Sequence, residues 1–195
     1  MNSTNYYGTT HDFDNGTVNM LTLKLEHDFA PGLTLRNTTR WDKTKEDAVY
    51  TTFTSPTITD ADPANWTLSR NISGAPTLKF QTNEIMTNQT NLSAKFDTGP
   101  LKHSINAGVE ATREQQWTFG ATGTSFPAAA NPYNLDSKVL GHGYAYNGNN
   151  TYGKTDLALG HLFDTITFDK PWQFAGGVSF DRYWTKYNHA YGTPT

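Results

Sequence analysis

Hydrophobic and polar residues alternate along residues 21–41, which read LTLKLEHDF, then Ala-Pro-Gly, then LTLRNTTRW. In an extended chain, Leu21 and Leu23 lie on one face, and Lys24 and Glu26 lie on the other. A period of two predicts strands with one apolar and one polar face, and Pro-Gly between two such runs predicts a tight turn. The pattern therefore predicts an antiparallel hairpin.

A three-residue loop at 30–32 fixes the register of this hairpin. It places Leu21 opposite Trp41, Leu25 opposite Asn37 and Glu26 opposite Arg36. In that register the apolar faces of the two strands coincide, and an acid meets a base across the pair. The second strand is expected to continue to about residue 53.

Strand character recurs in later segments, at 77–97, 101–119, 152–168 and 172–189. Short turns at 30–32, 98–100 and 169–171 join strands in pairs, and long loops at 54–76 and 120–152 join the pairs. In 152–168 apolar residues occupy both odd and even positions, so the pattern does not assign which face of that strand is apolar. The predicted fold is all-β, an antiparallel up-and-down meander of about six long strands.

The length of the strands points to a membrane barrel. A strand from 33 to 53 spans roughly 70 Å at about 3.4 Å per residue, whereas soluble strands usually have about 3–10 residues. Short turns that alternate with long loops are typical of outer-membrane barrels. Six strands are too few to close such a barrel, since about eight is the smallest bacterial number. The six strands are therefore expected to be part of a larger transmembrane barrel.

Two stretches carry a family resemblance. TLKLEHDFAPGLTLRNTTRW (22–41) and LFDTITFDKPWQFAGGVSFDRYWTKYN (162–188) resemble barrel hairpins of TonB-dependent outer-membrane siderophore receptors, especially the catecholate type. This family has a 22-stranded barrel with an N-terminal plug. The resemblance implies that residues 1–195 are an internal fragment of the barrel domain, with the plug absent.

The resemblance also implies a function and partners. Such a receptor lies in the bacterial outer membrane, contacts its lipid, binds an iron-siderophore complex and draws energy from TonB. Three alternatives stay open on the residues: a passive porin- or adhesin-type barrel, an outer-membrane hydrolase barrel, and a soluble all-β binding domain. The hydrolase would need an inward Ser/His/acid set, which the spacing does not supply.

Composition excludes several other classes of protein. The net charge of −3 leaves no basic footprint for nucleic acid, so no nucleic-acid partner is expected. The chain has no Cys, which removes disulfides and thiolate metal sites. No apolar run reaches the roughly 18 residues that a transmembrane helix needs. A mean hydropathy of −0.65 is compatible with a barrel, whose lumen side and loops are polar.

Catalytic and metal-binding motifs are not recognised. The six His residues show no zinc-protease spacing, and no Gly-x-Ser-x-Gly elbow occurs. Asp12-Phe13-Asp14-Asn15-Gly16 resembles only the start of a calcium loop. His27 and His103 fall on apolar faces near turns, which favours an interfacial position over metal binding. The chain is therefore expected to be no enzyme and to need no cofactor or metal.

Ligand-binding candidates lie in the long loops and on the polar face of the first hairpin. A ferric catecholate is anionic and aromatic, so Arg suits its charge and Tyr or Trp its rings. The loop candidates are Trp66, Arg70, Tyr133, Tyr144 and Tyr146. Arg36 and Arg40 face the predicted lumen, where they either meet the plug or an anionic ligand, or form wall salt bridges with Glu26 and its neighbours.

Overall fold

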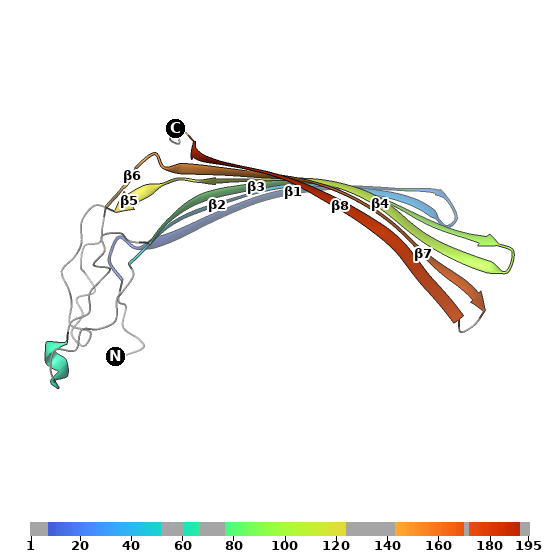
Figure 1. Ribbon diagram of the computed structural model, residues 1–195, viewed down its shortest axis with the longest axis horizontal. Coiled ribbons are helices and arrows are strands. Elements are labelled where there is room, and N and C mark those ends of the chain that lie inside the picture. Colours follow the sequence, from blue (N-terminus) through green and yellow to red (C-terminus); the bar gives the residue numbers. More distant parts are fainter. Residues whose placement is uncertain (1–7, 52–60, 67–76, 124–142, 170–171, 192–195) are drawn as a thin grey trace.

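The computed structural model describes residues 8–51, 61–66, 77–123, 143–169 and 172–191. Six long strands form one antiparallel sheet in the order β1-β2-β3-β4-β7-β8 (Figure 1). They are β1 (Phe13–Ala30), β2 (Leu33–Tyr50), β3 (Thr77–Thr98), β4 (Leu101–Thr118), β7 (Asn150–Asp169) and β8 (Trp172–Tyr191). The predicted meander of about six long strands is confirmed.

Small elements lie at the end of the sheet where the long loops are. β5 (Ala121–Gly123) and β6 (Tyr144–Tyr146) pair as a separate two-stranded sheet, and η1 (Pro63–Asn65) is a single 3-10 turn. Residues 120–152 were predicted to be one loop, which was wrong at both ends, because β5 and β6 occupy part of it and β7 begins at Asn150. Strands of three residues are too short to show an alternation of period two.

The predicted register of the first hairpin is confirmed. Leu21 faces Trp41, Leu25 faces Asn37 and Glu26 faces Arg36. The pairing shifts by one residue between Asp28 and Ala30, so only Pro31 and Gly32 remain unpaired in the turn, with Gly32 at a φ of 83°. A positive φ is open to glycine without the steric penalty of a Cβ. β2 ends at Tyr50, three residues before the predicted end at 53.

Strict pairing from strand to strand divides the sheet into two faces. We call the apolar face the one that carries Leu21, Leu35, Leu92, Val109, Leu162 and Val178, which the register places on the same side of the sheet. We call the polar face the opposite one, which carries Glu26, Arg36, Asn91, Asn106 and His161. The register also assigns β7, whose faces were open: Leu162 and Ile166 lie on the apolar face, and Leu159 and Phe163 lie on the polar face.

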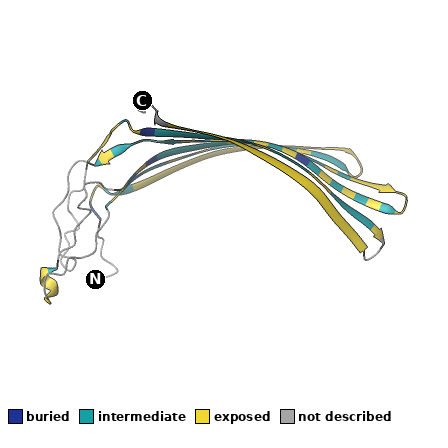
Figure 2. Ribbon diagram, viewed as in Figure 1, coloured by how far each residue is buried: buried dark blue, intermediate teal, exposed yellow. Residues whose placement is uncertain are grey.

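Among the described residues, the β5–β6 hairpin packs over the apolar face at its long-loop end, and no second layer of protein covers the rest of that face. Within the described residues, the buried hydrophobic side chains are Ala48, Val49 and Phe80, whereas Leu21 is 68% and Val178 70% exposed (Figure 2). A soluble sheet would bury this face against another element. Such a bare apolar face suits a lipid environment. Among the described helices, none is long and apolar enough to span a membrane.

The apolar face becomes charged towards the long-loop end. Along β2 the apolar section runs from Leu33 to Trp41, and Lys43 and Lys45 follow on the same face. Eight residue steps of about 3.4 Å make this section about 27 Å long, close to the roughly 25 Å apolar band of outer-membrane barrels. The strands therefore continue well beyond the apolar section.

Turns and loops lie at opposite ends of the sheet. The strands joined by the short turns β1–β2, β3–β4 and β7–β8 meet at one end of the sheet (Figure 1). The strand ends that flank the long connections, Tyr50, Thr77, Thr118 and Asn150, lie at the other end. Gly99, at a φ of 63°, makes the second short turn. This arrangement is the predicted one, with short turns and long loops alternating along the chain.

Candidate functional site

The polar face near the short turns holds a paired arginine. Arg36 donates from Nε to Glu26 Oε2 at 2.5 Å, and its Nη2 lies 2.5 Å from the same oxygen. Arg40 Nε lies 3.1 Å from Asp42 Oδ2 on the same face. Both candidate arginines therefore face the polar side as predicted, and each has a carboxylate partner. Their charges are balanced locally, which matches the salt-bridge alternative for these residues.

A hollow of about 630 Å³ opens on the polar face beside this arginine. His161 Nε2 and Asn106 Oδ1 are 2.9 Å apart, and Lys95 lies at the rim. Gly108 lies beneath them, because a Cβ there would be 2.3 Å from Asn91 Oδ1 and 2.5 Å from His161 Cε1. Because Gly108 of β4 has no side chain, the amide of Asn91 from β3 and the imidazole of His161 from β7 can approach each other above it. The wall here offers hydrogen-bond donors to a bound group.

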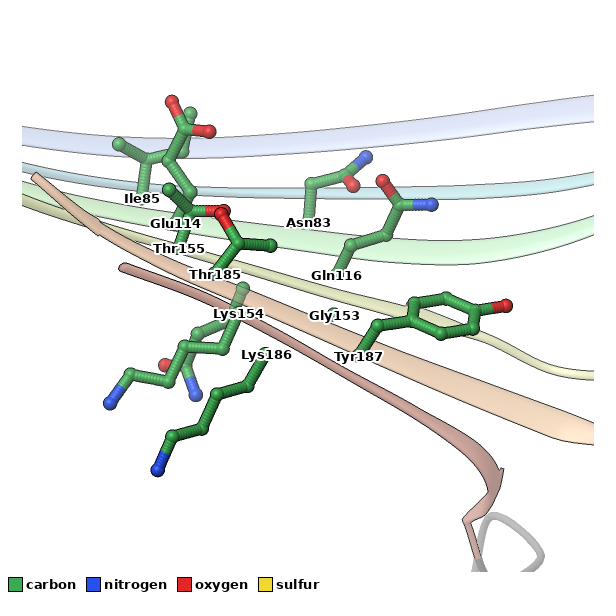
Figure 3. A pocket seen from close by; sticks show the side chains of 11 residues that line it. Asn83, Ile85, Glu114, Gln116, Gly153, Lys154, Thr155, Thr185, Lys186 and Tyr187 are labelled. Atoms are coloured by element: carbon green, nitrogen blue, oxygen red, sulfur yellow. The ribbon is translucent and has the colours of Figure 1, made fainter. Parts of the chain in front are cut away.

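A second hollow, of about 250 Å³, lies towards the long-loop end of the polar face (Figure 3). Its polar-face lining includes Asn83, Glu114, Gln116 and Tyr187. Gly153 pairs with Gln116 on one side and with Tyr187 on the other. Because Gly153 has no side chain, the backbone is partly exposed between these two residues. An exposed aromatic ring, two amides and a carboxylate thus line the upper wall.

Tyr144 and Tyr146 pack on the apolar-face side of the sheet. Their rings lie 4.7 Å and 5.3 Å from the ring of Phe80, measured between centroids. Phe80 is 1% exposed and belongs to the apolar face, where Phe13 lies 6.3 Å from Tyr144. The β5–β6 hairpin is thereby anchored against β3, and both tyrosines are held on the side opposite the two hollows.

Asp12 joins the two chain segments that flank the first hairpin at its long-loop end. Its carboxylate accepts hydrogen bonds from the backbone N–H and hydroxyl of both Thr9 and Thr51, at 2.7–3.2 Å. Partial burial raises the pKa of Asp12, but the bonds from Thr51 and Thr9 outweigh it, so its pKa lies below the ordinary value. The residue clamps the base of the following loop.

Of the remaining loop candidates, the structure describes Trp66 alone. Trp66 follows η1 and is half-buried, with its N–H bonded to the carbonyl of Pro63. Arg70 and Tyr133 lie outside the described residues. The polar-face pair of His161 and Asn106 was missed by the sequence prediction. Its signal lay in the register between β4 and β7, which the mixed parity of 152–168 concealed.

His103 and its neighbours form a polar contact on the apolar face, and among the residues that the structure describes they are not part of a metal site. In the described part of the chain, no group of three or more His, Asp or Glu residues is placed to hold a metal ion. His103 lies on the apolar face near its turn, as predicted, with Nδ1 2.7 Å from Asp164 Oδ2 and Nε2 2.8 Å from the hydroxyl of Thr98. Phe96 stacks on the ring at 5.0 Å.

The family model described as TonB dependent receptor-like, beta-barrel matches residues 1–194. The chain belongs to the TonB-dependent receptor family. Members of this family form barrels in the outer membrane of Gram-negative bacteria. By register, the apolar face and the polar face are the two sides of this part of the barrel wall.

Relatives of this TonB-dependent receptor chain include catecholate receptors. It is 38% identical over 193 residues to the catecholate siderophore receptor Fiu of Escherichia coli strain K12, covering 95% of this chain and 24% of Fiu. It is 28% identical over 199 residues to the probable TonB-dependent receptor BfrD of Bordetella pertussis, covering 93% of this chain and 26% of BfrD. The chain thus spans about a quarter of the length of the curated relatives it matches.

Solved structures agree with this assignment. The closed form of the ferric-catecholate import receptor Fiu from E. coli K12 matches with a TM-score of 0.85 at 37% identity, over 95% of this chain and 26% of that one. The siderophore receptor PiuA of Acinetobacter baumannii matches with a TM-score of 0.75 at 22% identity, over 97% of this chain and 29% of that one. The likeness to PiuA supports the fold alone.

Proposed function

We propose that this chain is part of the barrel wall of a receptor that imports a ferric siderophore of the catecholate type, with energy supplied through TonB. The observation that carries the proposal is 38% identity to a catecholate siderophore receptor across 95% of the chain. The fold supports it, since the strand ends that flank the long polar connections lie at one end of a wall with an apolar outer face. In this account residues 1–195 belong to the barrel domain, and the plug is a separate segment.

The two faces of the sheet perform different tasks in this proposal. The apolar face contacts the acyl chains of outer-membrane lipid. The polar face offers amides, hydroxyls and paired charges to the lumen, so that a hydrated anionic complex or a plug segment meets hydrogen-bonding groups instead of hydrocarbon. Arg36 and Arg40 contact the ligand through those guanidinium N–H groups that are not bonded to their carboxylate partners.

Capture of the ligand is assigned to the long loops. Trp66, Arg70 and Tyr133 supply rings and a cation that suit an anionic, aromatic iron complex. Tyr144 and Tyr146 contribute after movement of the β5–β6 hairpin, because their packing against Phe80 turns them away from the lumen in this structure. The iron complex is the cargo of the receptor, and transport by this wall involves no catalytic residue and no cofactor.

The test measures uptake of radioactive iron by E. coli cells that lack their own catecholate receptors and produce the full-length receptor containing this segment. We expect uptake of iron bound to a tris-catecholate siderophore, loss of uptake in the same strain without TonB, and no uptake of ferric citrate. Uptake that persists without TonB would indicate a passive porin. Uptake of ferric citrate in place of the catecholate complex would overturn the assigned ligand class.

A further inference from the structure

A cluster of cations lies on the lipid-facing side of the wall, directly beyond the apolar section. Arg113 of β4, Lys154 of β7, and Arg182 and Lys186 of β8 all belong to the apolar face by register. We call these four residues the basic cluster. They follow the apolar side chains Ala111, Ala158 and Phe180 on the same face of the same three strands. The basic cluster therefore lies at the edge of the membrane.

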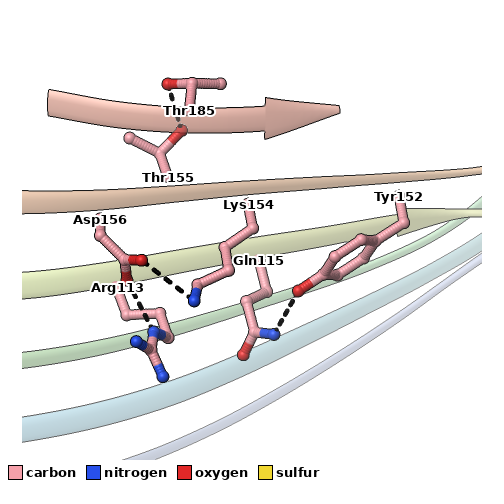
Figure 4. Close-up of polar contacts among 7 residues, drawn as sticks. All are labelled: Arg113, Gln115, Tyr152, Lys154, Thr155, Asp156 and Thr185. Carbon is pink, nitrogen blue, oxygen red and sulfur yellow. Dashed lines mark hydrogen bonds and ion pairs between the residues drawn. The ribbon is translucent and has the colours of Figure 1, made fainter. Parts of the chain in front are cut away.

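One carboxylate partly neutralises the basic cluster. Asp156 Oδ1 lies 2.7 Å from Arg113 Nε, and Asp156 Oδ2 lies 3.0 Å from Lys154 Nζ (Figure 4). Arg182 has a different contact, with its guanidinium 4.9 Å above the ring of Trp184. Two of the four cations are paired with this one acid, which leaves the basic cluster with a positive charge.

Two of the lysines are placed directly opposite each other. Lys154 and Lys186 are cross-strand partners in the β7–β8 pairing. Both side chains extend to the same side of the sheet, away from Glu114 (Figure 3). Like charges directly opposite one another destabilise a sheet. A bound anion between them would remove that repulsion.

Aromatic residues mark the level of the basic cluster. Trp184 lies on β8 between Arg182 and Lys186. Tyr152 lies two residues beyond Lys154 on β7, and Trp117 lies four residues beyond Arg113 on β4, with the two ring centroids 5.4 Å apart. Trp and Tyr collect where acyl chains give way to lipid headgroups. At that level, basic side chains attract the anionic headgroups of lipids.

We propose that the basic cluster binds the phosphate groups of an anionic lipid in the leaflet on the long-loop side of the membrane. The cations surround a site where one phosphate can accept hydrogen bonds from Lys154 and Lys186, and Arg113 or Arg182 can bind a second phosphate of the same headgroup. The aromatic rings contact the headgroup and upper acyl chains. The bound lipid fixes the depth of β7 and β8 in the membrane.

The test uses the full-length receptor, purified in a neutral detergent and freed of lipid. It is titrated with lipid A that carries two phosphates, and with the same lipid after enzymatic removal of both phosphates, and the bound lipids are counted by native mass spectrometry. We expect saturable binding of the phosphorylated form, weakened by high salt, and at least about tenfold weaker binding of the dephosphorylated form. Equal binding of both forms would refute the proposal without any variant.

A matched pair of variants locates the site. Lys154→Gln with Lys186→Gln is expected to weaken binding of phosphorylated lipid A by about tenfold. Lys24→Gln with Lys102→Gln removes the same charge from the polar face and should leave binding unchanged. An equal loss in both variants would show a general charge effect and overturn the assigned site. Siderophore uptake is not used as a readout, so failure of this proposal and failure of the proposed function are distinguishable.

Discussion

At the scale of single residues, Gly108 illustrates how the lumen wall is packed. Its missing Cβ makes room for Asn91 and His161, which would lie at 2.3 Å and 2.5 Å from that atom. We predict that Gly108→Ala lowers the free energy of unfolding by about 1–3 kcal/mol, because the two side chains must move. The measurement is urea unfolding of the full-length receptor in detergent micelles.

Gly160 provides the control for this prediction. It pairs with Val109, the next residue along β4, and the nearest atom to an added Cβ would be Gly108 O at 4.0 Å. Gly160→Ala should therefore change the unfolding free energy by less than about 1 kcal/mol. A loss as large as that of Gly108→Ala would show that the cost comes from the backbone and not from the contacts with Asn91 and His161.

Asp12 carries a prediction about pH. The pKa of its carboxyl is depressed in the folded state, so its hydrogen bonds stabilise the clamp above the unfolded pKa of about 3.9, and that stabilisation is lost as the pH falls through the folded pKa. Hydrogen exchange at the Thr51 amide should accelerate, relative to its intrinsic rate, as the pH is lowered below about 4. Asp12→Asn should remove this pH dependence, and a variant that keeps it would contradict the role of Asp12.

Some residue pairs could be predicted from the sequence and others could not. The contact of Glu26 with Arg36 followed from one local turn, since the turn sets every later pair of the hairpin. The contact of His161 with Asn106 spans 55 residues and depends on how a pair of strands docks after a long connection. Alternation within one strand carries no information about that register.

At the scale of elements, the strands and short turns were predictable because both signals are local. Alternation marked β1–β4 and β8, and Pro or Gly marked the turns. The β5–β6 hairpin was missed, since its position depends on packing of Tyr144 and Tyr146 against Phe80, a contact between distant segments. The loop candidates Tyr144 and Tyr146 were chosen for chemistry alone, which does not indicate on which side of the wall a ring lies.

The register of the first hairpin can be tested by cross-linking. Because this chain has no Cys, Glu26→Cys with Arg36→Cys introduces one defined pair at opposed positions. We expect a disulfide to form on mild oxidation of the folded receptor, since the two side chains share a face and directly opposed Cβ atoms lie about 4.5–5.5 Å apart. Glu26→Cys with Leu35→Cys is the control, because those side chains point to opposite faces. Efficient cross-linking of the control pair would contradict the register.

At the scale of the whole molecule, the sheet has two open edges. Within the described residues, β1 and β8 each pair on one side only, and the apolar face is bare. Unpaired edges promote association with other chains. We predict that the 195-residue chain produced alone associates or precipitates in buffer without detergent, as judged by size-exclusion chromatography with light scattering. A monodisperse soluble monomer would contradict the lipid-facing assignment.

Orientation in the outer membrane follows from the opposite positions of the turns and loops. Short turns of bacterial barrels face the periplasm and long loops face the exterior. Asn147 lies between β6 and β7 at the long-loop end of the sheet, and Pro100 lies in the β3–β4 turn. The second loop is also a place for an epitope tag, at Ala129, which lies outside the described residues.

The most direct measurement is labelling of single cysteines at these two positions with a membrane-impermeant maleimide, in the full-length receptor on intact cells. We expect Asn147→Cys to be labelled on intact cells, and Pro100→Cys to be labelled only after the outer membrane is opened. That result would place the six strands across the membrane with the ligand-capturing loops outside. Labelling of Pro100→Cys on intact cells, with Asn147→Cys protected, would reverse the orientation and remove these loops from siderophore capture.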